Sequence, residues 1–181
     1  MARTRRVAIL VTDGFEQVEM TGPREALDRS GYETAIVSPN PSTVLGMIHD
    51  RKGKAFRVDI PLSRARPEDF DALLLPGGVM NPDSLRMEPK AVRFVGSFFK
   101  AHKPVAAICH GPILLIEAGV LKGRTLTSFP SIRTDIENAG ARWVNKTMAS
   151  DGNLVTSRKP GDIPTFNKGM LKLFGNGNGS R

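Results

Sequence analysis

The sequence is poor in cysteine and in the larger aromatic side chains. Its 181 residues include one cysteine, one tryptophan and one tyrosine. A single cysteine excludes a disulfide within the chain, and chains without disulfides are typical of a reducing, cytoplasmic setting. With one tyrosine and one tryptophan, the chain also has little with which to stack on nucleic-acid bases.

Long apolar runs are missing as well. The longest ones, such as ALLLPGGV and VAAICHGPILLI, are interrupted by Gly, Pro or His before they reach the ~20 residues that a membrane span requires. The N-terminus is basic and then apolar, as in a signal peptide, but its apolar part ends at Val11. A first β-strand is expected there. The sequence therefore predicts a cytoplasmic protein without a transmembrane segment.

Acidic residues are outnumbered by basic ones. There are 26 Lys and Arg against 18 Asp and Glu, which gives a net charge of +8. The basic residues are scattered along the chain, and the clusters they form are small: Arg3, Arg5 and Arg6, and Arg51, Lys52 and Lys54. Nucleic-acid binding is therefore not expected, and a solvated basic surface is the favoured interpretation.

Short apolar segments alternate with helix-like segments from end to end. Strands are predicted at 5–11, 33–38, 71–76, 104–109 and 152–157, and helices at 16–31, 88–103 and 111–123. Several strand segments are apolar without alternation, as expected when both faces of a sheet are covered. We expect a flavodoxin-like, doubly wound α/β sandwich with a mainly parallel central sheet and helices on both faces.

Two segments interrupt this alternation and predict small β-hairpin additions. The first, 46–60, should turn at residues 52–53, and the second, 143–157, should turn at residues 151–152.

No repeat or linker divides the chain. A single domain is therefore expected over residues 1–174. The Gly- and Asn-rich end, residues 175–181, has nothing to bury and is expected to be a flexible tail.

The only cysteine stands between a predicted strand and a predicted helix. Residues 107–111, Ala-Ile-Cys-His-Gly, match a nucleophile elbow with Ala in place of the first Gly. Active sites of open α/β sheets collect beyond the carboxyl ends of the strands, where Cys109 falls. A helix N-terminus would favour its thiolate there, and free backbone amides could hold an oxyanion. The alternative is that Cys109 is a small buried hydrophobic residue.

Glycines flank the predicted nucleophile. Gly111 permits a tight turn after the cysteine, and Gly77 and Gly78 end another strand, where their amides could complete an anion-binding nest. A plain turn is the alternative for the glycine pair. The remaining histidines, His49 and His102, have no Cys or carboxylate at ligand spacing, so neither a metal nor another cofactor is expected.

Four segments together resemble a known family. FDALLLPGG, KPVAAICHGP, AGVLKGRTLTSFPSI and the early GFEQVE are similar to the motifs of the PfpI-type intracellular protease family. This family belongs to the class I glutamine-amidotransferase-like superfamily of the parkinsonism-associated protein deglycase. The resemblance runs in order from about Val7 to Phe174 and so covers nearly the whole chain.

The resemblance implies roles for several residues. Cys109 matches the nucleophile, and Glu16 matches a carboxylic acid kept protonated by burial against the sulfur, where it would favour the thiolate. His110 matches the catalytic histidine. Its partner acid comes from the neighbouring subunit in this family, and Asp83 is the candidate here, where the family often carries Glu. Phe129 matches the pocket wall, together with Pro130 and Ser131.

Simpler roles remain open for the same residues. Glu16 could be an acid placed favourably at a helix N-terminus, Asp83 could cap a turn, and Phe129 could pack in the core.

Three functions stay open at this stage. Cys109 could attack reactive carbonyls such as glyoxal, methylglyoxal or their protein adducts, as a deglycase or a cofactor-independent glyoxalase would. It could instead hydrolyse peptides inside a closed oligomer, or act as a redox sensor through its own oxidation. An acid shared between subunits implies a homo-oligomer, at least a dimer, with active sites near the interface.

Overall fold

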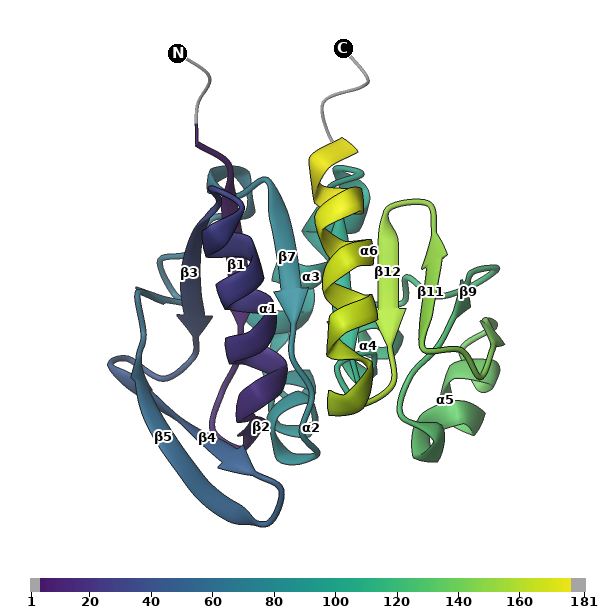
Figure 1. The fold of residues 1–181 in the computed structure, drawn as a ribbon, viewed down its shortest axis with the longest axis horizontal. Coiled ribbons are helices and arrows are strands. Elements are labelled where there is room, and N and C mark those ends of the chain that lie inside the picture. Colours follow the sequence, from purple (N-terminus) through teal and green to yellow (C-terminus); the bar gives the residue numbers. More distant parts are fainter. Residues whose placement is uncertain (1–3, 177–181) are drawn as a thin grey trace.

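A seven-stranded sheet forms the centre of the fold (Figure 1). The structure, a computed structural model, describes residues 4–176. The strand order is β11-β12-β8-β7-β1-β3-β6, and all neighbours are parallel except β11 and β12. The strands are β1 Arg6–Leu10, β3 Glu33–Ser38, β6 Ile60–Pro61, β7 Ala72–Leu75, β8 Val105–Ile108, β11 Met148–Asp151 and β12 Leu154–Ser157.

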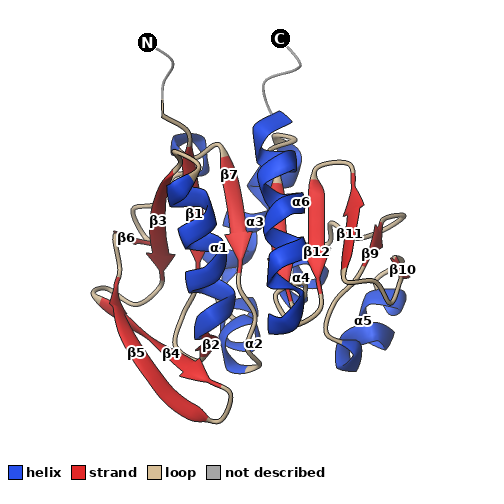
Figure 2. Ribbon diagram, viewed as in Figure 1, coloured by secondary structure: helices blue, strands red, loops and turns tan. Residues whose placement is uncertain are grey.

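Helices cover both faces of the sheet (Figure 2). On one face, α1 (Gln17–Arg29) and α6 (Ile163–Asn176) lie side by side. The other face carries α2 (Met80–Arg86), α3 (Pro89–Lys100), α4 (Ile113–Glu117) and α5 (Arg133–Asn138). Three short 3-10 turns connect elements: Pro67–Asp69, Pro130–Ile132 and Pro160–Asp162.

The two-sided burial explains the uninterrupted apolar strands. In β1, Ala8 and Leu10 enter the core on one face, whereas Val7 and Ile9 enter the core on the other. Because alternate side chains of a strand point to opposite faces, every position must be apolar when both faces are covered. The prediction of a doubly wound, mainly parallel sandwich is confirmed.

Small sheets are added at the edges. One contains β2 (Phe15–Glu16), β4 (Thr43–Ile48) and β5 (Arg51–Arg57), and the other pairs β9 (Thr125–Leu126) with β10 (Arg142–Trp143).

The predicted turn of the first hairpin is wrong. The chain turns at residues 49–50, where His49 has a φ of 57°. Residues 52–53 continue β5, in part because the Lys54 N–H donates to the Gln17 side chain at 2.7 Å. The second hairpin turns at residues 152–153, one residue later than expected.

Two predicted helix ends differ from the observed ones. The helix expected at 111–123 is limited to α4, because Gly119 turns the chain away with a φ of 67°. At the C-terminus α6 continues through Asn176, so the first two residues of the expected tail are helical. Residues 177–181 lie outside the described part of the chain. Among residues 4–176, no helix has both the length and the apolarity to span a membrane.

Three neighbouring parallel strands have their carboxyl ends at the same edge of the sheet. The carboxyl ends of β1, β7 and β8 lead into residues 11–16, the glycine pair at 77–78 and Cys109, respectively. These three connections build the candidate site.

Candidate active site

Cys109 occupies a sharp turn between β8 and α4. Its φ of 62° lies in the left-handed region, which is strained for a residue with a Cβ. Two backbone hydrogen bonds hold it there, because its N–H donates to the Ser157 carbonyl at 3.0 Å and its carbonyl accepts from the Phe129 N–H at 2.9 Å. The Gly111 N–H closes the turn on the Ile108 carbonyl at 2.9 Å. The turn has the geometry of a nucleophile elbow.

A buried carboxyl group faces the sulfur, and it belongs to Glu19. The Glu19 side chain is fully buried and interacts with Cys109, while its Oε2 accepts a hydrogen bond from the Gly77 N–H at 3.0 Å. No nitrogen or oxygen atom of the described residues hydrogen-bonds to Oε1. Oε1 is therefore the oxygen available to carry a proton.

The prediction that Glu16 lies against Cys109 is wrong. Glu16 precedes α1, and its Oε2 accepts the His49 N–H at 3.0 Å. Glu19 follows one helical turn later and points inward with Met20 and Leu27. The segment GFEQVE contains both acids, and the motif alone did not distinguish them. The signal that could have done so is the helical spacing from Glu19 to the apolar positions of α1.

Burial is the main cause of the shifted pKa values of Glu19 and Cys109. It raises the pKa of Glu19 to about 8, and the nearby Glu16 carboxylate adds to the rise. Burial also raises the pKa of Cys109, as does Glu19 in its charged form, whereas the N–H groups of Gly78 and His110 lower it. At neutral pH Glu19 is protonated, so its charge does not oppose the thiolate and its proton can be donated to it.

The glycine pair lies directly against these groups. A Cβ at Gly77 would sit 2.6 Å from the Cys109 Cβ and 2.5 Å from Glu19 Oε2, so only glycine fits at this position. Gly78 has a φ of 79°, which favours glycine at this position, and its own N–H lowers the pKa of the Cys109 thiol. With the His110 N–H, this gives two backbone donors at one nucleophile. That is the donor arrangement that stabilises an oxyanion.

His110 is held on both ring nitrogens. Nδ1 lies 3.2 Å from the Cys109 sulfur, and Nε2 lies 3.0 Å from the hydroxyl oxygen of Ser131. Its ring stacks on Phe129 with centroids 4.8 Å apart. Burial lowers the pKa of His110, so the imidazole is neutral at neutral pH and can accept a proton. The sequence suggested Ser131 only as pocket wall and gave no sign of this bond.

Asp83 is not at this site within its own chain. It lies in the first turn of α2 and is exposed, and the helix begins three residues before it, so it is not a cap. Two exposed methionines stand at the two ends of this helix: Met80, its first residue, is 60% exposed, and Met87, which follows its last residue, is 81% exposed.

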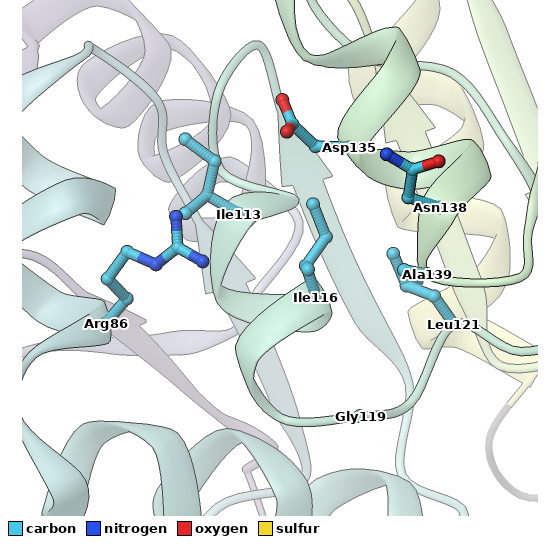
Figure 3. A pocket seen from close by; sticks show the side chains of 8 residues that line it. All are labelled: Arg86, Ile113, Ile116, Gly119, Leu121, Asp135, Asn138 and Ala139. Atoms are coloured by element: carbon cyan, nitrogen blue, oxygen red, sulfur yellow. The ribbon is translucent and has the colours of Figure 1, made fainter.

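A separate pocket of about 500 Å³ opens between α2, α4 and α5 (Figure 3). Arg86 borders it on one side and Asp135 and Asn138 on the other, with Ile113 and Ile116 between them. Cys109 is not among the lining residues, so this pocket is distinct from the candidate site. In the part of the chain that the structure describes, no three His, Cys, Asp or Glu side chains gather as metal ligands would.

Nearly the whole chain resembles known proteins. The model of the DJ-1/PfpI family matches residues 5–173. An uncharacterized protein of Staphylococcus aureus is 41% identical over 171 residues, which cover 93% of this chain and 98% of that protein. An uncharacterized protein of Staphylococcus epidermidis is 41% identical over 170 residues, which cover 93% and 96% of the two chains.

Solved structures share the fold. A protein of Anabaena variabilis with DJ-1/ThiJ/PfpI-like and ferritin-like domains matches with a TM-score of 0.89 and 36% identity. The match covers 98% of this chain and 50% of that one, so this chain spans about half of the two-domain protein. Drosophila melanogaster DJ-1beta matches with a TM-score of 0.85 and 27% identity over 96% of this chain and 92% of its own.

Proposed function

The chain belongs to the DJ-1/PfpI family, and on that basis we propose that it is a cysteine-dependent enzyme that acts on small reactive carbonyls. Glyoxal and methylglyoxal, free or as protein adducts, are the substrates that fit the site best. Cys109 is the nucleophile and no cofactor is required. The cytoplasm, where such carbonyls arise, is the proposed location.

The observation that supports this proposal most strongly is that Cys109 is almost completely buried and has hydrogen-bond donors close to it. Cys109 is only 7% exposed, its sulfur lies 3.2 Å from His110 Nδ1, and Glu19 and the N–H groups of Gly78 and His110 act on the pKa of its thiol. A small, flat dicarbonyl can reach such an atom. A peptide bond in an extended chain needs an open cleft on both sides of the nucleophile.

The residues of the site support a complete reaction of methylglyoxal. The Cys109 sulfur adds to the aldehyde carbon, and the former carbonyl oxygen takes up a proton, which gives a hemithioacetal. Neutral His110 then removes the proton from that carbon, and the electron pair of this C–H bond forms an enediolate with the neighbouring carbonyl. One proton returns to the former ketone carbon, and the hydroxyl proton of the hemithioacetal is transferred to the former ketone oxygen, which gives a lactoyl thioester. Water hydrolyses the thioester and releases lactate and the thiol. The net reaction adds one water to methylglyoxal.

The other two functions receive less support from the same geometry. Peptide hydrolysis requires more access to Cys109 than this chain offers. A redox sensor requires a thiol that is accessible to oxidants, whereas the Cys109 thiol is buried.

We also propose that the active protein is a homo-oligomer, at least a dimer, in which a partner subunit completes the site. The exposed methionines beside Asp83 give α2 an apolar surface that a second copy could cover. Both ring nitrogens of His110 already have partners, so an incoming Asp83 would have to replace Ser131 at Nε2.

Lactate formation from methylglyoxal, measured without added thiol, tests the proposed function. Wild-type protein should form lactate, and Cys109→Ala should reduce the rate to background. A labelled casein digest run in parallel tests the peptidase alternative. Casein cleavage that depends on Cys109, without lactate formation, would overturn the proposal.

A further inference from the structure

A buried side chain that does not touch the sulfur is hydrogen-bonded to the glycine turn at residues 76–78. Asn81, in the first turn of α2, is fully buried. Its Nδ2 donates to the carbonyls of Pro76 and Gly77, both at 3.1 Å. Its Oδ1 accepts the N–H of Thr12 at 2.8 Å, just beyond β1. One amide group thus ties the glycine turn to the end of a central strand.

The direction of a peptide's carbonyl fixes the direction of the next N–H. No peptide of the described chain is cis, and in a trans peptide the C=O and N–H groups point in opposite directions. When Asn81 holds the Pro76 carbonyl, the Gly77 N–H points the other way, toward Glu19 Oε2 at 3.0 Å. The same relation holds for the next peptide: the Gly77 carbonyl faces Asn81, so the Gly78 N–H points the other way, where it lowers the pKa of both Cys109 and Glu19.

We infer that Asn81 is a positioning residue that aims two backbone donors, one at Glu19 and one at the Cys109 sulfur. A glycine pair has no side chains to resist rotation of its peptides, so this orientation needs an external anchor. The Glu16 N–H also reaches the Gly77 carbonyl, but at 3.4 Å it is the weaker contact. Asn81 alone binds both carbonyls.

The inference deepens the proposed function and rests on it, because the donors matter for catalysis only if Cys109 is the nucleophile. It predicts that loss of the Asn81 amide leaves the thiol in place but removes an aligned donor from the thiolate. Two titratable groups face the thiol, Glu19 on α1 and His110 next to it in the chain, and Glu16 acts on Glu19. An uncharged replacement of Asn81 leaves all three unchanged.

The test compares Asn81→Ala with Asn153→Ala. Asn153 also donates its side-chain amide to a backbone carbonyl, that of Lys103 at 2.7 Å, but at the opposite end of β12 from the site. The rate of Cys109 alkylation by iodoacetamide is measured against pH for both variants and wild type. Asn81→Ala should move the midpoint upward by about one pH unit, as expected for a lost hydrogen bond to a charged group. Asn153→Ala should leave the midpoint unchanged.

Methylglyoxal turnover gives the second readout. Asn81→Ala should lower kcat about tenfold to a hundredfold with KM within about twofold, since the donors act mainly on the developing charge. A folded Asn81→Ala protein with the wild-type alkylation profile would overturn the inference. A wild type without turnover would refute the proposed function instead, and the alkylation shift would still decide the role of Asn81.

If Asn81→Ala does not fold, hydrogen exchange of the Asn81 side-chain amide in the wild-type protein tests the inference instead. Both Asn81 side-chain amide protons are engaged in buried hydrogen bonds, so they should exchange with solvent far more slowly than those of the exposed Asn138. Exchange of the Asn81 protons as fast as that of Asn138 would contradict the proposed anchor.

Discussion

Replacement of Glu19 by glutamine should change how stability depends on pH. In the folded protein the pKa of Glu19 is raised to about 8 from 4.5, mainly by burial. The folded state therefore holds this proton more tightly than the unfolded state does. The stabilisation is fully present below pH 4.5, and it is lost as the pH rises toward 8.

The magnitude follows from the same pKa. Between pH 5 and 8 the unfolded chain releases the Glu19 proton while the folded chain keeps it. The free energy of unfolding thus falls by roughly 1.4 kcal/mol per pH unit relative to a protein without the group. The complete rise of the Glu19 pKa, from 4.5 to about 8, corresponds to a change of about 5 kcal/mol in the free energy of unfolding. Glutamine keeps the shape and an oxygen for the Gly77 N–H but has no proton to lose, so Glu19→Gln removes this dependence.

Urea unfolding at pH 5, 6, 7 and 8 measures the effect. The difference in unfolding free energy between Glu19→Gln and wild type should change steadily in favour of the variant, by about 4 kcal/mol over this range. Glu25→Gln, at an exposed position of the same helix, serves as the control and should keep the wild-type slope. Parallel pH dependence of Glu19→Gln and wild type would refute the assignment of a buried, protonated Glu19.

Three further substitutions test the geometry of the site. Gly77→Ala places a Cβ 2.6 Å from that of Cys109. We expect the free energy of unfolding in urea to fall by about 2–3 kcal/mol and turnover to be lost. Wild-type stability would contradict the close approach. Ser131→Ala removes the hydrogen bond to His110 Nε2. It should lower kcat several-fold and the free energy of unfolding by about 1 kcal/mol. An unchanged kcat would show that this hydrogen bond has no role in catalysis. If a partner completes the site, Asp83→Asn should be inactive without loss of Tm, and mixing it with inactive Cys109→Ala should restore turnover; no restoration would exclude a shared site.

Features that depend on local pattern and burial could be predicted from the sequence. The apolar strands follow from a sheet covered on both faces, as the alternating residues of β1 illustrate. The elbow could be predicted because a strand, a nucleophile and a glycine turn are adjacent in the chain, and Cys109 adopts the positive φ that such a turn requires.

Features that depend on tertiary contacts could not be predicted from the sequence. Glu16 and Glu19 stand in the same short motif, and the choice between them depends on which face of α1 meets the sheet. The turn of the first hairpin was misplaced because a contact from Gln17 holds Lys54 in β5. Asn81 and Ser131 lie in segments without a recognisable motif, and their roles follow only from the neighbours that the fold brings to them.

The pH dependence of Cys109 alkylation in wild type, Glu19→Gln and the control Glu25→Gln tests the central claim most directly. Protonated Glu19 should favour the thiolate by donating a hydrogen bond, and a glutamine amide is a weaker donor. The midpoint of alkylation should rise by about one pH unit in Glu19→Gln and stay at the wild-type value in Glu25→Gln. Three superimposable profiles, each like that of an ordinary free cysteine, would contradict the claim that Glu19 and Cys109 form one reactive pair.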